Sequence, residues 1–138
     1  MICLDTNAVI AVLNSRSSPV SVRLDAEMRE GGAVALSPIV LFELHYGVAR
    51  SAQPERNALR IADFLSGPIA VLPFEIEDAE EAGNIRAELE RLGTPIGPYD
   101  ILIAAQARRR DALLVSANTR EYMRVPRLRI EDWTAAGA

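Results

Sequence analysis

Four carboxylate side chains stand at positions where an acid could do chemistry. Asp5 follows directly after a run of three apolar residues, and Glu43 lies within an almost wholly apolar helical segment. Asp100 opens a second apolar segment, and Glu121 belongs to the polar cluster SANTREY. A charge among apolar residues must be paired or bound to a metal ion, so each acid is a candidate ligand for a divalent cation.

Each acid also has a simpler explanation when it is considered alone. Asp5, like Thr6 and Asn7, is a common N-cap residue for a helix. Glu43 would reach water from one side of its helix, and Asp100 would complement the dipole at a helix start. Four half-buried acids that share one crevice, however, repel each other unless cations bind them. The joint pattern therefore favours a metal site.

Alternating apolar strands and amphipathic helices must position these acids. We expect strands over 2–4, 33–36, 69–72 and 113–115, with a short edge strand over 128–130. The expected helices are 8–13, 20–30, 39–50, 55–65, 75–92 and 101–110. This order predicts a parallel sheet with helices on both faces, and ligands gather outside the carboxyl ends of such strands. Asp5 and Glu121 both follow a strand end, and Asp100 can reach the same edge from a helix start.

The basic residues narrow the function, because all 15 are arginine and the chain has no lysine. A P-loop nucleotide site and a Schiff-base enzyme both need a lysine and are excluded, and a response-regulator receiver domain is disfavoured. The net charge of −4 argues against a protein that coats nucleic acid without selectivity. Residues 101–130 nevertheless hold seven arginines against two acids. The run 108–110 most simply complements a helix dipole, and the acids of 75–92 most simply form a solvated face.

Length and the remaining composition indicate a single domain over 1–138. No apolar run approaches the roughly 18 residues of a membrane span, and the N-terminus lacks the basic region of a signal peptide, so we expect a cytoplasmic protein. Cys3 is the single cysteine and lies within an apolar strand. A buried thiol is therefore expected rather than a redox or nucleophilic group.

Four segments together resemble the PIN-domain ribonucleases, and within them the VapC-type toxins of bacterial toxin–antitoxin pairs. The segments are LDTNAVIAVLN, SPIVLFELHYGVAR, GTPIGPYDILIAAQA and SANTREYMRVPRLRIEDW, in this order over nearly the whole chain. The resemblance implies a three-layer α/β/α PIN-like domain with a mostly parallel sheet of four or five strands. It also implies that Asp5, Glu43 and Asp100 bind Mg²⁺ or Mn²⁺, and that a homodimer is partnered by a VapB-type antitoxin.

The chain departs from the family pattern at Asn118, where many PIN domains have an aspartate. An amide accepts hydrogen bonds but contributes no charge, so the fourth acid is either missing or supplied by Glu121. The implied chemistry is metal-dependent hydrolysis of an RNA phosphodiester bond by an activated water, without a protein nucleophile. Thr6 would support a carboxylate or a phosphate by hydrogen bonding.

We expect the arginines of residues 101–130 to bind the RNA. Arg108, Arg120 and Arg124 are expected to hold the RNA backbone, and such contacts position the substrate without reading its sequence. A catalytically inactive PIN-like module that binds RNA or a protein partner is the alternative, because the fourth acid is in doubt. An aspartate-nucleophile phosphatase built on Asp5 is a third interpretation, but that class needs a lysine and a second acid where this chain has Asn7.

Overall fold

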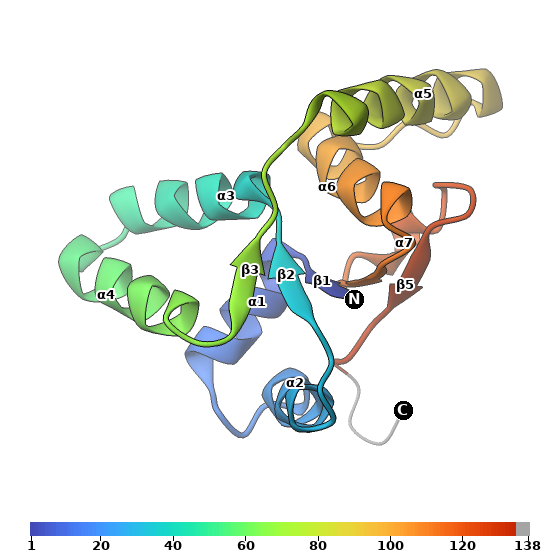
Figure 1. Cartoon of the computed structure of the whole chain (residues 1–138). Coiled ribbons are helices and arrows are strands. Elements are labelled where there is room, and N and C mark those ends of the chain that lie inside the picture. Colours follow the sequence, from blue (N-terminus) through green and yellow to red (C-terminus); the bar gives the residue numbers. More distant parts are fainter. Residues whose placement is uncertain (135–138) are drawn as a thin grey trace.

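A five-stranded parallel sheet forms the centre of the computed structural model, which describes residues 1–134 (Figure 1). Its strands are β1 (Ile2–Leu4), β2 (Val34–Leu36), β3 (Ile69–Val71), β4 (Leu113–Val115) and β5 (Arg129–Glu131). They lie in the order β3-β2-β1-β4-β5, and every neighbouring pair is parallel. The predicted α/β class with a parallel sheet is confirmed, and the sheet has five strands.

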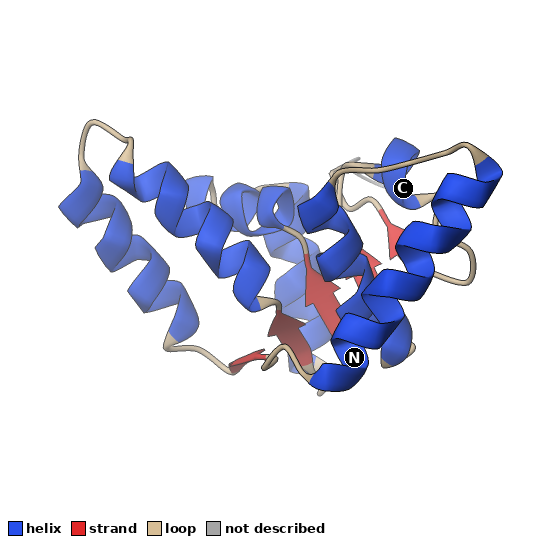
Figure 2. Ribbon diagram, turned by 90° about the horizontal axis from the view of Figure 1, so that it is seen from above, coloured by secondary structure: helices blue, strands red, loops and turns tan. Residues whose placement is uncertain are grey.

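Helices lie on both sides of the strands (Figure 2), which gives the predicted three-layer α/β/α arrangement. Within residues 1–134 they are α1 (Thr6–Asn14), α2 (Pro19–Arg29), α3 (Pro38–Ala49), α4 (Pro54–Leu65), α5 (Ile76–Leu92), α6 (Pro98–Arg109) and α7 (Thr119–Tyr122). Figure 1 shows α3 and α4 on one side of the molecule and α5 with α6 on the other. The short helix α7 was not predicted, and the other boundaries differ from the predicted ones by a few residues.

Local sequence explains where most helices begin and end. Four of them start with a proline, which lacks an N–H that the first helical turn would leave unpaired in any case: Pro19, Pro38, Pro54 and Pro98. Ser37 caps α3 by accepting a hydrogen bond from the backbone of Ile39. Gly93 ends α5 with φ 69°, a left-handed conformation that suits glycine, as predicted.

The core follows the predicted burial of the strands. Every residue of β1 and β2 is buried, whereas β3 and β5, at the two edges of the sheet, are largely exposed. Cys3 is buried, as predicted, and burial raises the pKa of its thiol to about 11, so the thiol is neutral. Trp133 packs into the same core, where Arg23 lies 4.9 Å above its ring.

Among residues 1–134 we find no helix with the length and apolar character needed to span a membrane.

An ionic cluster joins α5 to α6 and corrects two predictions. Asp78 is fully buried, and its Oδ1 lies 2.7 Å from Arg109 Nε and 2.8 Å from Arg110 Nη1. Burial alone would raise the pKa of Asp78, but the hydrogen bonds from Arg110 and Arg109 outweigh it and hold the pKa well below its usual range. The acidic side of α5 is therefore not wholly solvated. The arginines at the end of α6 neutralise buried acid rather than only complementing the helix dipole.

Candidate active site at the carboxyl edge of the sheet

The order of the sheet reverses between β1 and β4. From β1 the chain adds β2 and β3 on one side, and β4 and β5 lie on the other. In open α/β sheets a ligand crevice forms outside the carboxyl ends of the strands at such a switch point. Leu4 and Val115 are partners at the ends of β1 and β4, so the next residues, Asp5 and Ser116, come together. Ser116 Oγ donates a hydrogen bond of 2.7 Å to Asp5 Oδ2.

Asp5 is buried, with 4% of its surface exposed, and its side chain does not cap the helix. It occupies the N-cap position of α1 in an extended conformation, but its carboxylate accepts no cap hydrogen bond. Instead Oδ2 accepts from Ser116 and from Asn7 Nδ2 at 3.2 Å, and Oδ1 lies 3.3 Å from the hydroxyl of Tyr122. Helix capping therefore does not explain Asp5, and its role as a metal ligand stays a prediction.

Asp100 comes to the same point from the first turn of α6. Its Oδ1 lies 3.2 Å from the hydroxyl of Tyr122, which thus stands between two carboxylates. Burial, a hydrogen bond with Glu121 and the charge of Asp5 raise the pKa of Asp100 to about 6. A helix N-terminus favours the ionised acid and would lower the pKa, so the neighbouring acids and burial dominate.

Glu43 is tied to this edge through Thr6. Thr6 Oγ1 donates a hydrogen bond of 2.8 Å to Glu43 Oε1, across from α1 to α3. Because Thr6 is the residue after Asp5, the contact draws Glu43 toward the end of β1. Glu43 is half-buried and accepts a hydrogen bond from Thr6, whereas an acid on a solvated helix face would be exposed to water.

Asn118 and Glu121, which follow β4, form a hydrogen-bonded pair. Asn118 Nδ2 donates to Glu121 Oε2 at 3.3 Å, and the backbone N–H of Asn118 donates to Ser116 Oγ at 2.9 Å. Glu121 also acts on Asp100, since it contributes to the raised pKa of that acid. The amide at position 118 therefore orients a neighbouring acid.

These acids form a chain of contacts rather than a closed metal cage. Within residues 1–134, no three Asp, Glu, His or Cys side chains converge closely enough to hold one ion together. The donor set nevertheless suits Mg²⁺ or Mn²⁺, because Mg²⁺ prefers oxygen ligands and commonly binds through one or two carboxylates while retaining water. Asp5 and Asp100 are the pair that fits this description.

The predicted RNA contact of Arg108 does not match its position. Its side chain is 6% exposed and lies 2.5 Å from Glu81 Oε1 and 3.0 Å from Glu88 Oε1 on α5. A guanidinium held between two acids has no free donor face for a phosphate. Arg120 on α7 is exposed, and Arg124 donates to the carbonyl oxygen of Pro95 at 2.8 Å.

Ser116, Asn7 and Tyr122 belong to the site and were not predicted for it. The Ser116 hydroxyl donates to Asp5 and accepts from Asn7 Nδ2 at 3.2 Å and from the backbone of Asn118, which uses its full hydrogen-bonding capacity. Ser116 follows a buried strand as Asp5 does, and this is the signal that could have identified it. It becomes useful only when β1 and β4 are known to be neighbours.

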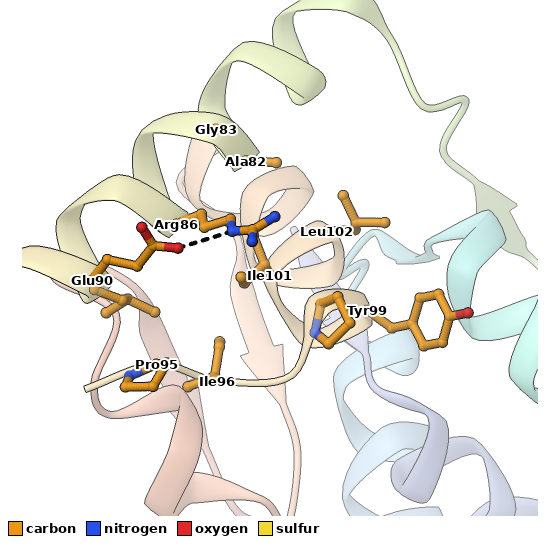
Figure 3. Close-up of a pocket in the computed structure, with 11 residues that line it drawn as sticks. Ala82, Gly83, Arg86, Glu90, Pro95, Ile96, Tyr99, Ile101 and Leu102 are labelled. Carbon is orange, nitrogen blue, oxygen red and sulfur yellow. Dashed lines mark hydrogen bonds and ion pairs between the residues drawn. The ribbon is translucent and has the colours of Figure 1, made fainter. Parts of the chain in front are cut away.

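A pocket of about 500 Å³ lies between α5, α6 and the loop that joins them (Figure 3), and none of the four candidate acids is in its lining. Arg86 and Glu90 form an ion pair of 3.1 Å at its edge. Figure 3 shows the ring of Tyr99 extending from α6 toward α3. There it packs edge-on against Phe42, with ring centroids 5.3 Å apart, and both rings remain about half exposed.

The PIN domain family profile matches residues 2–128. This chain belongs to the PIN-domain family. It is similar to the tRNA(fMet)-specific endonuclease VapC of Shigella flexneri, with 44% identity over 131 residues, which cover 95% of this chain and 96% of that protein. Ribonuclease VapC2 of Haemophilus influenzae is 43% identical over 130 residues, which cover 94% of this chain and 96% of that protein.

Solved structures place this PIN domain among VapC-type proteins. VapBC2 from Rickettsia felis, bound to a DNA fragment from their promoter, matches with a TM-score of 0.89 and 35% identity, covering 96% of this chain and 99% of that chain. DNA-bound VapBC from Salmonella typhimurium matches with a TM-score of 0.87 and 39% identity, covering 96% of this chain and 97% of that chain. The predicted membership of the VapC-type PIN-domain ribonucleases is confirmed.

Proposed function

We propose that this PIN domain is a metal-dependent endoribonuclease that hydrolyses RNA phosphodiester bonds and acts as the toxin of a toxin–antitoxin pair. One observation carries the proposal: Asp5 and Asp100 are gathered around a single buried hydroxyl at the switch point of the sheet. The relatives named as VapC ribonucleases support the nuclease class. The carboxylate donor set supports the requirement for Mg²⁺ or Mn²⁺.

Asp5 and Asp100 would hold the ion. When bound, a divalent cation supplies Lewis-acid stabilisation of negative charge on the phosphate and makes a water molecule a stronger nucleophile. The chain's own residues keep the acids in place, because Ser116 orients Asp5 and Thr6 orients Glu43. Glu43 uses Oε1 for the contact with Thr6, and its other oxygen would orient water or complete the ion's ligands. No side chain has to attack the RNA.

The RNA would meet exposed aromatic rings beside the acids. Phe42 precedes Glu43 and Tyr99 precedes Asp100, and the two rings are 51% and 48% exposed. Single-stranded RNA is bound largely by stacking unpaired bases on aromatic side chains. Arg120 is exposed on α7 and would contact the phosphate backbone of the RNA.

We further propose a VapB-type antitoxin as partner, as the R. felis and S. typhimurium VapBC structures suggest. A pocket of about 180 Å³ between α1, α3 and α4 includes Glu43 in its lining. An amphipathic antitoxin segment would lie there, and one of its arginines would pair with the acids of the site. Replacing each basic residue of the antitoxin's C-terminal segment in turn tests this. If cleavage by the bound toxin never returns, inhibition does not use such an arginine.

The homodimer is proposed on the family resemblance alone. Sedimentation velocity of the purified chain tests it. A monomer at all concentrations would contradict the proposal.

The function itself is tested with purified protein and total cellular RNA, incubated with and without Mg²⁺ or Mn²⁺ and followed by mapping of the new RNA ends. Wild-type protein should cut at defined positions only when metal is present, and Asp100→Asn should not cut. Binding of RNA without cleavage under every metal condition would instead identify the inactive PIN-like module.

A further inference from the structure

The hydroxyl of Tyr122 is the one polar atom of a side chain that otherwise belongs to the core. Tyr122 has no exposed surface and its ring lies within the hydrophobic cluster. A phenylalanine would fill the same space, so the hydroxyl adds no packing. Burying a hydroxyl costs free energy unless it is hydrogen-bonded. Among the described residues, its hydrogen-bond partners are Asp5 and Asp100.

The position of the hydroxyl is nearly symmetric between the two acids. It lies 3.3 Å from Asp5 Oδ1 and 3.2 Å from Asp100 Oδ1. A hydroxyl has a single proton and donates to one acceptor at a time. Both distances exceed the roughly 2.5–3.0 Å range of most O–H···O bonds, as expected for an oxygen shared by two acceptors. Burial and the charges of Asp5 and Asp100 raise the pKa of Tyr122, so it remains a donor.

Tyr122 also connects three elements at this point. Asp5 belongs to the end of β1, Asp100 to the start of α6, and Tyr122 to α7. Asp5 has further donors in Ser116 and Asn7, both on its Oδ2. Asp100 also has a hydrogen bond with Glu121. Within residues 1–134, Tyr122 is the side chain that hydrogen-bonds to both acids.

We propose that Tyr122 is a positioning residue that sets the spacing and orientation of the Asp5 and Asp100 carboxylates and thereby raises the affinity of the site for a divalent cation. The proposal rests on the proposed metal-dependent function. Two like charges brought this close repel each other, and a shared donor holds them near one point without an ion. Groups that orient metal ligands in this way typically contribute about 10- to 100-fold to metal affinity or activity.

The test is a calorimetric titration of the metal-free, full-length protein with Mn²⁺. Tyr122→Phe removes the hydroxyl and keeps the ring, and Tyr46→Phe makes the same chemical change on the exposed face of α3, where Tyr46 is 59% exposed. Tyr122→Phe should bind Mn²⁺ about 10- to 100-fold more weakly than wild type, and Tyr46→Phe should bind as wild type does. RNA cleavage by Tyr122→Phe should recover as the Mn²⁺ concentration is raised, which a general structural defect would not allow.

The outcomes separate this proposal from the proposed function. If wild type binds Mn²⁺ and Tyr122→Phe binds it equally well or more tightly, the positioning role is wrong and the metal site stands. If wild type binds no Mn²⁺ or Mg²⁺, the proposed function and the positioning role both fail.

A second measurement uses wild-type protein and therefore tests the proposal even if Tyr122→Phe does not fold. Wild-type protein labelled with ¹³C at tyrosine Cζ gives signals from three tyrosines, which Tyr46→Phe and Tyr99→Phe assign. Saturating Mg²⁺ should shift the Tyr122 signal and leave that of Tyr46 in place. An unmoved Tyr122 signal at saturation would overturn the proposal.

Discussion

Thr6 Oγ1 and Glu43 Oε1 are joined by a hydrogen bond of 2.8 Å that links the residue after Asp5 to the middle of α3. Thr6→Val keeps the shape of the side chain and removes the donor. Hydrogen bonds to a charged group contribute about 1.5 to 3 kcal/mol, and we expect the free energy of unfolding to fall by up to this amount. RNA cleavage should fall about 10-fold or more, because the freed Glu43 loses its orientation.

A matched control for this change is Thr134→Val. Thr134 donates its hydroxyl to Asp132 at an exposed position far along the chain. Cleavage rates and chemical denaturation of both variants provide the measurement. Equal activity of Thr6→Val and wild type would show that Glu43 needs no support from Thr6.

Asp5→Asn and Asp100→Asn should abolish RNA cleavage while leaving the metal-free protein as stable as wild type or more so. Each change removes one of two neighbouring, repelling charges, of which Asp5 is buried and Asp100 is half-buried. Cleavage assays and thermal melts in the presence of a chelator check both parts. A variant that cuts RNA at the wild-type rate would remove that acid from the proposed ligand set.

The stability of the metal-free protein should rise as the pH falls from about 6 to 4. Asp100 has a raised pKa of about 6, so in this range the folded protein binds a proton that the unfolded chain does not. The folded state therefore gains stability with acid and loses it as the pH rises through 6. Denaturant titrations at several pH values should show this slope in wild type and a smaller slope in Asp100→Asn. An unchanged slope in that variant would assign the effect to other groups.

Divalent metal should raise the melting temperature of wild-type protein. An ion that binds only the folded state stabilises it by about 2.7 kcal/mol at a free concentration 100 times its dissociation constant. The shift should shrink in Asp5→Asn and persist in Glu80→Gln, which alters an exposed acid of α5. Loss of the shift in Glu80→Gln alone would place the ion on the acidic surface of α5.

Asp78→Ala should lower the free energy of unfolding by about 3 to 5 kcal/mol, because it leaves Arg109 and Arg110 without their buried partner. Since the pKa of Asp78 is lowered in the folded state, its stabilisation is complete above its ordinary value of 3.8 and is lost as the pH falls below that value. Glu77→Ala, at an exposed position on the same helix, should change stability little. Similar losses in both variants would mean that the cluster contributes nothing specific.

Phe42→Ala and Tyr99→Ala should weaken RNA binding, seen as a higher KM with a smaller effect on kcat. Stacking contributes about 1 to 3 kcal/mol per base. Leu59→Ala removes a similarly exposed apolar side chain, 71% exposed on α4, and should leave KM unchanged. An effect of equal size in all three variants would contradict a specific stacking role.

Local patterns in the sequence were enough for most of the fold and for three of the acids. The apolar strands, the prolines at helix starts and the glycine after α5 act through neighbouring backbone geometry, which does not depend on the rest of the chain. Asp5, Glu43 and Asp100 were recognisable because each interrupts or closes an apolar run. The resemblance to VapC-type proteins was visible in four segments that follow one another in order over nearly the whole chain.

Tertiary structure alone decided which side chains meet. Ser116 reaches Asp5 because β4 lies beside β1, although 111 residues separate the two side chains. Arg108 looked available for RNA and instead lies between two acids of α5, because α5 and α6 pack against each other. Tyr122 stands in the polar segment SANTREY of the sequence, and only the convergence of β1, α6 and α7 places its hydroxyl between two acids. A sequence pattern records the character of each position, but contacts between distant segments depend on the strand order and helix packing of the folded chain.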